Sequence, residues 1–244
     1  MTGITFGGSF TLGISLSNAA TQNPATIASG AYVGNTGTAA AHNGDAIYGT
    51  AGIAWNVFNY GTIVANTGTS SSVGIDLKSG GLVTNGSAGS ITGQYAGIRI
   101  VGAAGTVANF GTITATAPIG IGVGVVLFAG GSVTNGQSGS SSGLISGHLN
   151  GVEVAGAAGT VANFGTITAS TGIGVVLFAG GSVTNGQSGS SSGLISGQFV
   201  GVAIEGSAST LANFGTITGS GRYGVYLGLG GSVTNGQSGS SSGL

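Results

Sequence analysis

Apolar and polar residues alternate along most of this chain in short runs that glycine-rich stretches separate. One four-residue pattern, in which glycine, an aliphatic residue, a variable residue and a second aliphatic residue follow one another, recurs seven times. The variable position is acidic, basic, apolar or aromatic, whereas the aliphatic positions never change in kind. Each copy is therefore predicted to be a short β-strand with one buried face. The copies are Gly74–Leu77, Gly97–Ile100, Gly124–Leu127, Gly151–Val154, Gly174–Leu177, Gly201–Ile204 and Gly224–Leu227.

The chain is built from internal repeats. The string GVVLFAGGSVTNGQSGSSSGLISG occupies Gly124–Gly147 and again Gly174–Gly197. Each long unit divides into two similar halves, and each half carries three strand patterns joined by glycine-rich corners. A single unit buries too few side chains to fold alone, so neighbouring units must stack. The sequence predicts an all-β, right-handed parallel β-helix, a β-solenoid with three short strands per coil and about eight coils from Ala46 onward.

The first residues do not match the repeat as closely. Residues 1–45 are expected to be a separate N-terminal segment, and residues 46–244 to hold the solenoid repeats, with the last coil truncated. Apolar residues alternate within the first part of this segment, which predicts strand structure that either caps the first coil or joins a neighbouring subunit. These residues are Ile4, Phe6, Phe10, Leu12, Ile14 and Leu16.

Asparagine follows the second strand pattern in every predicted coil. Its amide donates one hydrogen bond and accepts another, so asparagines stacked at the strand spacing of about 4.8 Å form a continuous ladder. An internal structural ladder is the main interpretation, and a row of polar contacts to a ligand is the alternative. The residues are Asn59, Asn85, Asn109, Asn135, Asn163, Asn185, Asn213 and Asn235.

Aromatic residues also recur at fixed places. Odd coils place an aromatic residue after the ladder asparagine, whereas even coils place glycine there and carry Phe128 and Phe178 after another strand. Interleaved large and small residues at a corner explain this pattern, and an aromatic strip that binds carbohydrate is the alternative. The first set is Tyr60, Phe110, Phe164 and Phe214, and the second is Gly86, Gly136, Gly186 and Gly236.

Composition excludes several classes of protein. The chain has 55 glycines without a three-residue period and only 2 prolines, so it is not collagen. A hydrophobic content of 41% is too high for a disordered chain. Three basic residues give no electrostatic footprint for nucleic acid or anionic lipid, and the lack of cysteine excludes disulfides. No apolar stretch approaches the roughly 18 to 20 residues that span a bilayer.

Candidate chemistry is sparse. Catalysis on a β-helix needs clustered carboxylates with basic partners, and the acids are Asp45, Asp76, Glu153 and Glu205, while the bases are Lys78, Arg99 and Arg222. Asp76 and Arg99 hold equivalent outward positions on adjacent coils, so they are expected to form a surface ion pair with Lys78 nearby. Glu153 and Glu205 have no charged neighbour at matching positions. The sequence therefore predicts neither an enzyme nor a cofactor.

The two histidines do not form a metal site in the predicted arrangement. His42 precedes the repeats and His148 lies at a corner, so both are expected to be solvated loop residues. A further alternative is ice binding through Thr-x-Thr rows, which occur at Thr112–Thr114, Thr166–Thr168 and Thr216–Thr218. The intervening coils break these rows with Leu144 and Leu194.

The units GVxLxxGGxVTNxxxGxIxG and GVxIxGAAGTVxNxGTI resemble the β-helical passenger repeats of bacterial outer-membrane autotransporter adhesins and related surface proteins. The resemblance covers about Asn23 to Leu244, including NPATIASG and DAIYGTAGIAWNVFNYGTI. It implies export to the bacterial cell surface and an adhesive, biofilm-forming or fibre-forming role. Neither a signal peptide nor a C-terminal translocating domain is recognised here, so we expect an excerpt of a longer chain or export by another route.

Open strand edges at the ends of a solenoid invite pairing with another copy. The expected function is therefore an extracellular structural or adhesive subunit that self-associates head to tail into filaments. Cell-surface molecules or glycans are expected ligands, with no nucleic-acid partner. The alternative is a binding module that uses an outward side-chain ladder to hold a glycan or ice.

Overall fold

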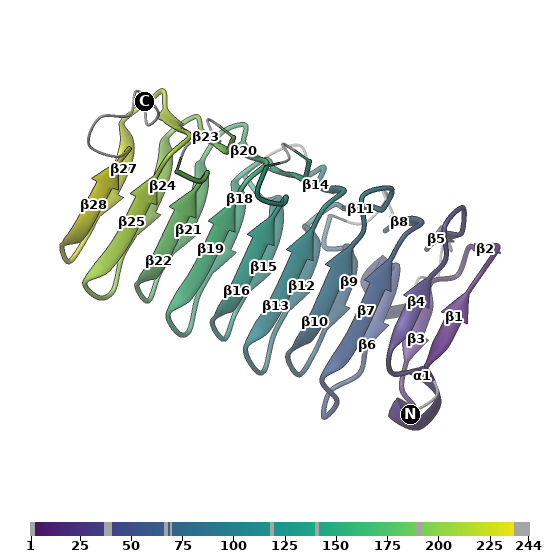
Figure 1. Ribbon diagram of the computed structural model, residues 1–244. Coiled ribbons are helices and arrows are strands. Elements are labelled where there is room, and N and C mark those ends of the chain that lie inside the picture. The colour runs from purple at the N-terminus through teal and green to yellow at the C-terminus, as the bar shows by residue number, and fades with distance from the viewer. Residues whose placement is uncertain are drawn as a thin grey trace.

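A computed structural model describes residues 3–36, 41–65, 68, 70–117, 120–139, 142–188 and 192–236. Three parallel β-sheets run the length of an elongated molecule, and the chain visits each sheet once per turn (Figure 1). Consecutive coils stack in chain order, so the first and last described strands, β1 (Ile4–Phe6) and β28 (Gly231–Asn235), lie at opposite ends of the stack. The predicted parallel β-solenoid with three short strands per coil is confirmed.

The sheets are named by their strands in spatial order. Sheet A consists of β1 (Ile4–Phe6), β4 (Ala25–Ile27), β7 (Trp55–Asn59), β10 (Gly81–Asn85), β13 (Gly105–Asn109), β16 (Gly131–Asn135), β19 (Gly159–Asn163), β22 (Gly181–Asn185), β25 (Ser209–Asn213) and β28 (Gly231–Asn235). Sheet B consists of β2 (Ser9–Phe10), β5 (Tyr32–Gly34), β8 (Thr62–Val64), β11 (Ser90–Gly93), β14 (Thr112–Ala115), β17 (Leu144–Gly147), β20 (Thr166–Ala169), β23 (Leu194–Gly197) and β26 (Thr216–Gly219). Sheet C consists of β3 (Ile14–Leu16), β6 (Ile47–Gly49), β9 (Val73–Leu77), β12 (Ala96–Ile100), β15 (Val123–Leu127), β18 (Asn150–Val154), β21 (Ile173–Leu177), β24 (Val200–Ile204) and β27 (Tyr223–Leu227).

We number the coils from the N-terminus, so that coil 1 is β1–β3 and coil 9 is β25–β27, and β28 begins coil 10. The predicted strand pattern lies in β9, β12, β15, β18, β21, β24 and β27, all in sheet C. The N-terminal segment is also wound into the solenoid, because its strands form coil 1 and the start of coil 2. β1 pairs with β4, and β3 pairs with β6, in the parallel register of the later coils.

Two short helical segments interrupt the early coils. The helix α1 (Ala19–Gln22) lies between coils 1 and 2, and the Asn18 side chain accepts a hydrogen bond from the Ala20 amide at its start. The 3-10 segment η1 (Ala41–Gly44) precedes β6, and within it His42 and Asn43 have left-handed backbone angles. Both segments connect strands of two different sheets. The stacking of the coils therefore depends on the strands.

Aliphatic side chains fill the interior in columns. In sheet A the column is valine in most coils, in sheet B it is isoleucine from coil 3 onward, and sheet C contributes two aliphatic residues in most coils. Val133, Ile145, Val152 and Val154 show the pattern, and none is more than 1% exposed. Burial of each such side chain contributes roughly 1.5–3 kcal/mol, and every one touches equivalents in the coils on either side.

Sheet C strands carry a local irregularity at glycine. Ala96 pairs with Val123 and Ile98 with Val125, while Gly97 and Gly124 have no paired position in this register. A Cβ on Gly124 would lie 2.5 Å from Ile145 Cγ2 and 2.6 Å from the Gly151 carbonyl oxygen. The Cα of this glycine faces the core, and so does the side chain of the aliphatic residue that follows it. The first and fourth residues of the strand therefore lie on the same outer face.

The close approach at Gly124 generates a prediction. Gly124→Ala forces a methyl group against a core side chain and a main-chain carbonyl, and we expect it to lower the free energy of unfolding by about 1–3 kcal/mol. Gly7→Ala is the matched control, because a Cβ at Gly7 meets nothing within 4 Å. Denaturant unfolding followed by circular dichroism measures both changes. Equal stability of the two variants would contradict this account of the sheet C glycines.

Candidate functional site

The eight predicted asparagines lie in one column at the corner between sheets A and B. Each side-chain amide donates from Nδ2 to the Oδ1 of the asparagine in the next coil, at 2.7–2.8 Å, from Asn59 through to Asn235. The column is possible because the parallel register aligns these residues directly, as in Asn109 with Asn135. The result is an unbroken amide ladder along the solenoid.

The same amides also close the corner of each coil. Asn135 Nδ2 donates to the Gly143 carbonyl at 3.1 Å, within its own turn, and to the Thr166 carbonyl of the next coil at 3.0 Å. The asparagines from Asn59 to Asn185 have no exposed surface. A ligand has no access to amides buried in this way, so their geometry serves the fold.

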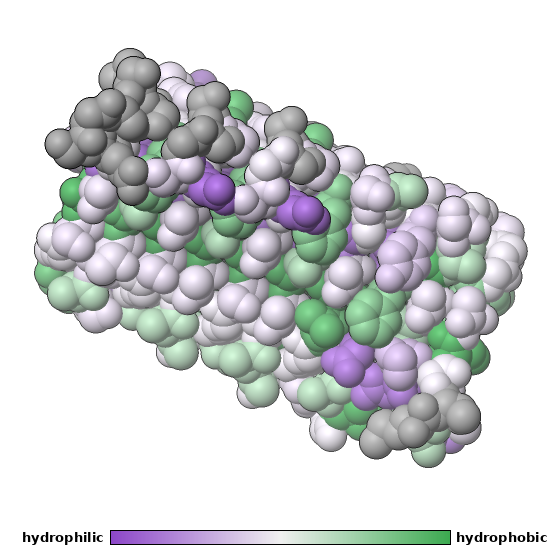
Figure 2. Space-filling model, viewed as in Figure 1, coloured by the Kyte–Doolittle hydropathy of each residue, from purple (hydrophilic) through white to green (hydrophobic). Residues whose placement is uncertain are grey.

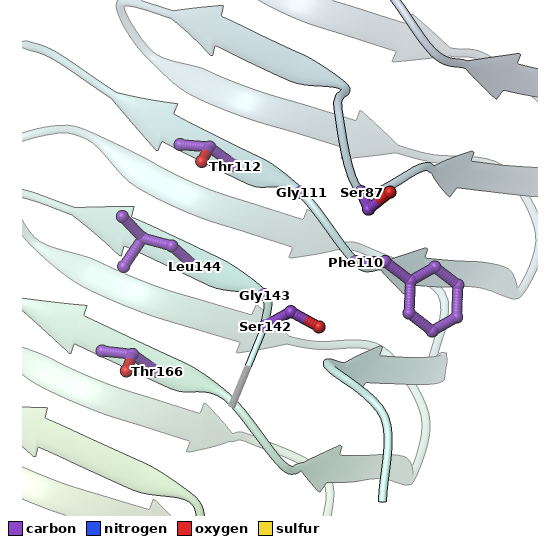
Figure 3. Close-up of a pocket in the computed structure, with 8 residues that line it drawn as sticks. All are labelled: Ser87, Phe110, Gly111, Thr112, Ser142, Gly143, Leu144 and Thr166. Carbon is purple, nitrogen blue, oxygen red and sulfur yellow. The ribbon is translucent and has the colours of Figure 1, made fainter. Parts of the chain in front are cut away.

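Aromatic and glycine residues interleave beside the ladder. A Cβ on Gly86 would lie 2.6 Å from Tyr60 Cδ1, so the tyrosine ring occupies the space that glycine leaves free in the next coil. Further along, Phe110 borders a shallow hollow of about 360 Å³ (Figure 3). The hydroxyl groups of Thr112, Thr166 and Ser142 line it with the ring, and no lining residue is titratable.

Charged residues gather at one place on the outer face of sheet C. The sequence has 7 charged residues, and Asp45, Asp76, Lys78 and Arg99 all belong to this cluster. Asp76 and Arg99 are paired positions in β9 and β12, and Asp45 lies just before β6 in coil 2. The cluster therefore links three successive coils.

The geometry of the cluster corrects one prediction. Arg99 holds Asp76 through two hydrogen bonds, Nε to Oδ1 at 2.9 Å and Nη2 to Oδ2 at 2.6 Å, and Lys78 Nζ lies 2.6 Å from Oδ2. The Asp76 side chain has no exposed surface, whereas those of Lys78 and Arg99 are 26% and 20% exposed. The expected ion pair is present, but it is a buried carboxylate enclosed by two partly exposed cations and not an exposed surface pair.

Asp45 completes the cluster from the preceding coil. It is 3% exposed, and its Oδ1 accepts a hydrogen bond from the Val73 amide at 2.8 Å. Burial raises the pKa of Asp45 to about 7, and the neighbouring Asp76 carboxylate adds to the rise through its charge and a side-chain hydrogen bond. Burial also acts against ionisation of Asp76, but Arg99 and Lys78 outweigh it and lower the pKa of Asp76. Over the mildly acidic range Asp45 therefore holds a proton while Asp76 is ionised.

Sequence reasoning missed this carboxyl pair. Asp45 and Asp76 are 31 positions apart, and Asp45 lies outside the strand pattern that aligned the other outward residues. The sequence offered one signal: Asp45 precedes a strand of sheet C, and Asp76 lies in the sheet C strand of the next coil. Their contact depends on how the segment before β6 crosses the sheet, which residue spacing does not reveal.

The two histidines and the two glutamates lie at separate places along the solenoid. His42 is exposed and stacks on the Tyr48 ring with centroids 3.7 Å apart, while His148 is half-buried and bonds through Nδ1 to Ser170 at 2.9 Å. Glu153 accepts a hydrogen bond from Asn150 at 2.9 Å, and Glu205 is exposed. In the part of the chain that the structure describes, no three His, Cys, Asp or Glu side chains come together as a metal site would require.

Hydroxyl groups form straight columns on two outer faces. On sheet B, Leu144 and Leu194 occupy one column only, and the neighbouring column is unbroken. It contains Thr92, Thr114, Ser146, Thr168, Ser196 and Thr218. Sheet A carries a similar column of Thr106, Ser132, Thr160, Ser182, Thr210 and Ser232. The face formed by sheet A is accordingly of mostly intermediate hydropathy (Figure 2).

No family model, curated protein or solved structure matches the chain. Among the described residues, no helix has the length and apolar character that crossing a membrane requires. Function must therefore be argued from the fold, the hydroxyl columns and the few charged and aromatic clusters of the chain itself.

The amide ladder generates a prediction. Asn135→Ala removes the acceptor for Asn109 and the donor to Asn163, leaving buried polar groups without partners, and we expect a loss of about 1–3 kcal/mol for each group left unpaired. Asn235→Ala is the control, because Asn235 is exposed and accepts its ladder bond from Asn213 at the last described strand. Urea unfolding should show a large shift for the first variant and a small one for the second. Similar shifts would contradict a cooperative internal ladder.

The carboxyl pair generates a second prediction. Because the pKa of Asp45 in the folded protein is about 7 against an ordinary value of 3.8, the folded state holds a proton that the unfolded state has released between these values. Stability should therefore fall as pH rises from about 4 to about 7, by at most roughly 1.4 kcal/mol per pH unit. Urea midpoints measured between pH 5 and pH 8 test this slope.

Asp45→Asn identifies the source of that slope. Asparagine retains an acceptor for the Val73 amide and supplies a donor toward Asp76, so it imitates the protonated acid at every pH. We expect the variant to match the unaltered protein at pH 5, to exceed its stability at pH 8, and to have a nearly flat profile between them. Glu205→Gln, at an exposed carboxylate, should leave the slope unchanged. A slope that persists in Asp45→Asn would place its origin elsewhere.

Proposed function

We propose that this chain is an extracellular structural protein of a bacterial cell surface, a solenoid passenger or fibre subunit with an adhesive role. The observation that carries the proposal is the in-register stack of nearly identical coils, which produces a straight rod with continuous side-chain columns. Such a rod places a long, uniform surface at a distance from its attachment point, and this suits display and adhesion better than catalysis.

The outer surface supports a non-enzymatic role. Both carboxyl groups of the charged cluster are buried, at 3% exposure for Asp45 and 0% for Asp76, so a substrate does not reach them. The sheet A and sheet B faces present hydroxyl columns, and the net charge is −1. A surface with so little charge gives weak repulsion between copies and favours lateral contact.

Localisation rests on the resemblance of the repeats to autotransporter passenger repeats. Those proteins stand outside the cell, and a solenoid without cysteine retains its structure there without disulfides. The amide ladder and the buried aliphatic columns supply the cohesion instead. The proposal therefore places this chain on the outside of a bacterium.

Head-to-tail pairing of copies is the proposed route to a fibre. Ile4 donates to the Pro24 carbonyl at 2.9 Å, and Phe6 accepts from Ala28 at 3.0 Å. Alternation along the strand then directs the main-chain groups of Thr5 away from β4, and the same alternation directs those of Val233 away from β25. Among the described strands, β1 and β28 are the outermost of sheet A, so these groups face edges where a strand of another copy would complete the pairing.

A second candidate function is binding to a flat, repeating surface such as ice or a glycan lattice. The observation that favours it is the unbroken hydroxyl column from Thr92 to Thr218, in which Thr218 Oγ1 donates to Ser196 Oγ at 3.0 Å. Rigid β-sheet spacing of about 4.8 Å gives such a column a fixed repeat.

Thr5→Pro tests the fibre. Proline removes the N–H that faces the open edge but leaves the bonds from β1 to β4 intact, so the monomer should fold while filaments disappear. Electron microscopy of the purified protein shows the filaments, and circular dichroism verifies the fold.

Thr5→Val is the matched control, since it retains the N–H and should retain the filaments. Filaments of unchanged length in Thr5→Pro would eliminate edge pairing as the route of assembly. Monomers of the unaltered protein that show thermal hysteresis in freezing solutions would favour the second candidate.

A further inference from the structure

Within its sheet C strand and the residue before it, coil 9 differs from coils 5 and 7 at three positions only. Coils 5 and 7 read Gly-Val-Gly-Val-Val-Leu from Gly122 and Gly-Ile-Gly-Val-Val-Leu from Gly172, whereas coil 9 reads Arg-Tyr-Gly-Val-Tyr-Leu from Arg222. The inward glycine, valine and leucine are the same in all three. The substituted residues are Tyr223 and Tyr226, which the glycine irregularity directs to the outer face, and Arg222, which directly precedes the strand.

The outer face of sheet C is more exposed at coil 9 than at coil 5, and β27 is the last strand of that sheet. In coil 5, Val123 and Val126 are 3% and 0% exposed and form a small outer cluster against which Tyr95 of the preceding coil packs. Phe199 holds the place equivalent to Tyr95 beside coil 9, but it is 46% exposed. Tyr223 and Tyr226 are each 43% exposed.

The three rings surround a pocket of about 260 Å³. Ile173, Val200 and Ala203 form its apolar lining, and Glu205 and Arg222 contribute one negative and one positive charge. The Tyr223 and Tyr226 rings lie 5.9 Å apart and nearly parallel, at 21°. The Arg222 guanidinium lies 5.7 Å from the Phe199 ring centroid and 5.3 Å from that of Tyr223.

These groups define the chemistry of a ligand. Aromatic faces accept a flat surface of C–H groups, Glu205 accepts hydrogen bonds, and Arg222 donates them. The two charges cancel, so neither a cation nor an anion is favoured as a whole. Because the volume lies below the roughly 300–1,000 Å³ of pockets for drug-sized ligands, one ring fits better than a longer molecule.

We propose that this pocket binds a neutral pyranose ring, with the C–H face of the sugar against Tyr223 and Tyr226 and its hydroxyl groups on Glu205 and Arg222. The biological meaning of the site rests on the proposed extracellular function, because a surface protein meets glycans. The site lies on the outer face of sheet C and includes β27, the last strand of that sheet, whereas the proposed fibre contact uses main-chain groups at the edge of β28. Sugar binding and filament formation are therefore measured by separate assays.

Saturation-transfer NMR with the full chain tests the site. The probes are the methyl glycosides of glucose, galactose, mannose and N-acetylglucosamine, with glucuronate and choline as charged comparisons. We expect saturation of the ring C–H protons of at least one neutral glycoside, stronger than for either charged probe. No saturation of any neutral glycoside would overturn the proposal, as would preferential binding of glucuronate or choline.

The chain itself supplies a variant that should fold. Arg222→Gly, Tyr223→Ile and Tyr226→Val together restore the sequence of coil 7, whose side chains already occupy the same place in the solenoid. We expect the triple variant to lose about tenfold or more in sugar affinity with an unchanged thermal midpoint. Phe178→Ala is the control, since it removes an aromatic ring that is 43% exposed but outside the pocket.

Two further readouts separate the alternatives. Retained sugar binding in the triple variant would overturn the assignment, as would a dimer in sedimentation velocity that the triple variant abolishes, since a second copy would then occupy the pocket. Electron microscopy of the triple variant should show filaments like those of the unaltered protein. Loss of sugar binding with filaments present supports the site, whereas absence of filaments in every variant contradicts the fibre and leaves the sugar assay valid.

Discussion

The structure depends on parallel pairing between coils in one fixed register. A coil of this length cannot bury enough surface to offset its own ordering, so each coil is stable only between two others. Register then determines everything else, because a shift by one residue would move the buried aliphatic column to the outside. The asparagine ladder reinforces the register at one corner, since each buried amide has its partners only when Asn109, Asn135 and Asn163 are directly aligned.

This constraint separates two kinds of position. Inward positions hold glycine, valine, isoleucine or leucine with little choice, because neighbouring coils leave no spare volume, as the contacts around Gly124 show. Outward positions of sheet C accept aspartate, arginine, valine, glutamate, alanine and tyrosine in successive coils. A solenoid therefore varies its surface without altering its core, and local clusters such as the carboxyl pair and the aromatic pocket arise on a uniform scaffold.

The charged cluster shows how far burial changes the meaning of an ion pair. On an exposed strand, Asp76 and Arg99 would contribute little to stability. Enclosed by coils 2 to 4, the same pair must be fully hydrogen-bonded, and the second acid, Asp45, stays neutral over much of the pH range because ionising it beside Asp76 is unfavourable. These few charged residues therefore connect three successive coils.

The sequence alone was sufficient for the repeat, the strand pattern, the number of strands per coil and the alignment of the asparagines, because these follow from periodicity and each position has the same environment in every coil. Only the tertiary structure placed Asp45 against Asp76, wound residues Ile4–Gly49 into two further coils and joined Phe199 to Tyr223 and Tyr226 in one pocket. Those contacts join residues outside the repeating pattern or from different coils. Their distances depend on the path of corners and irregular segments, and periodicity carries no information about that path.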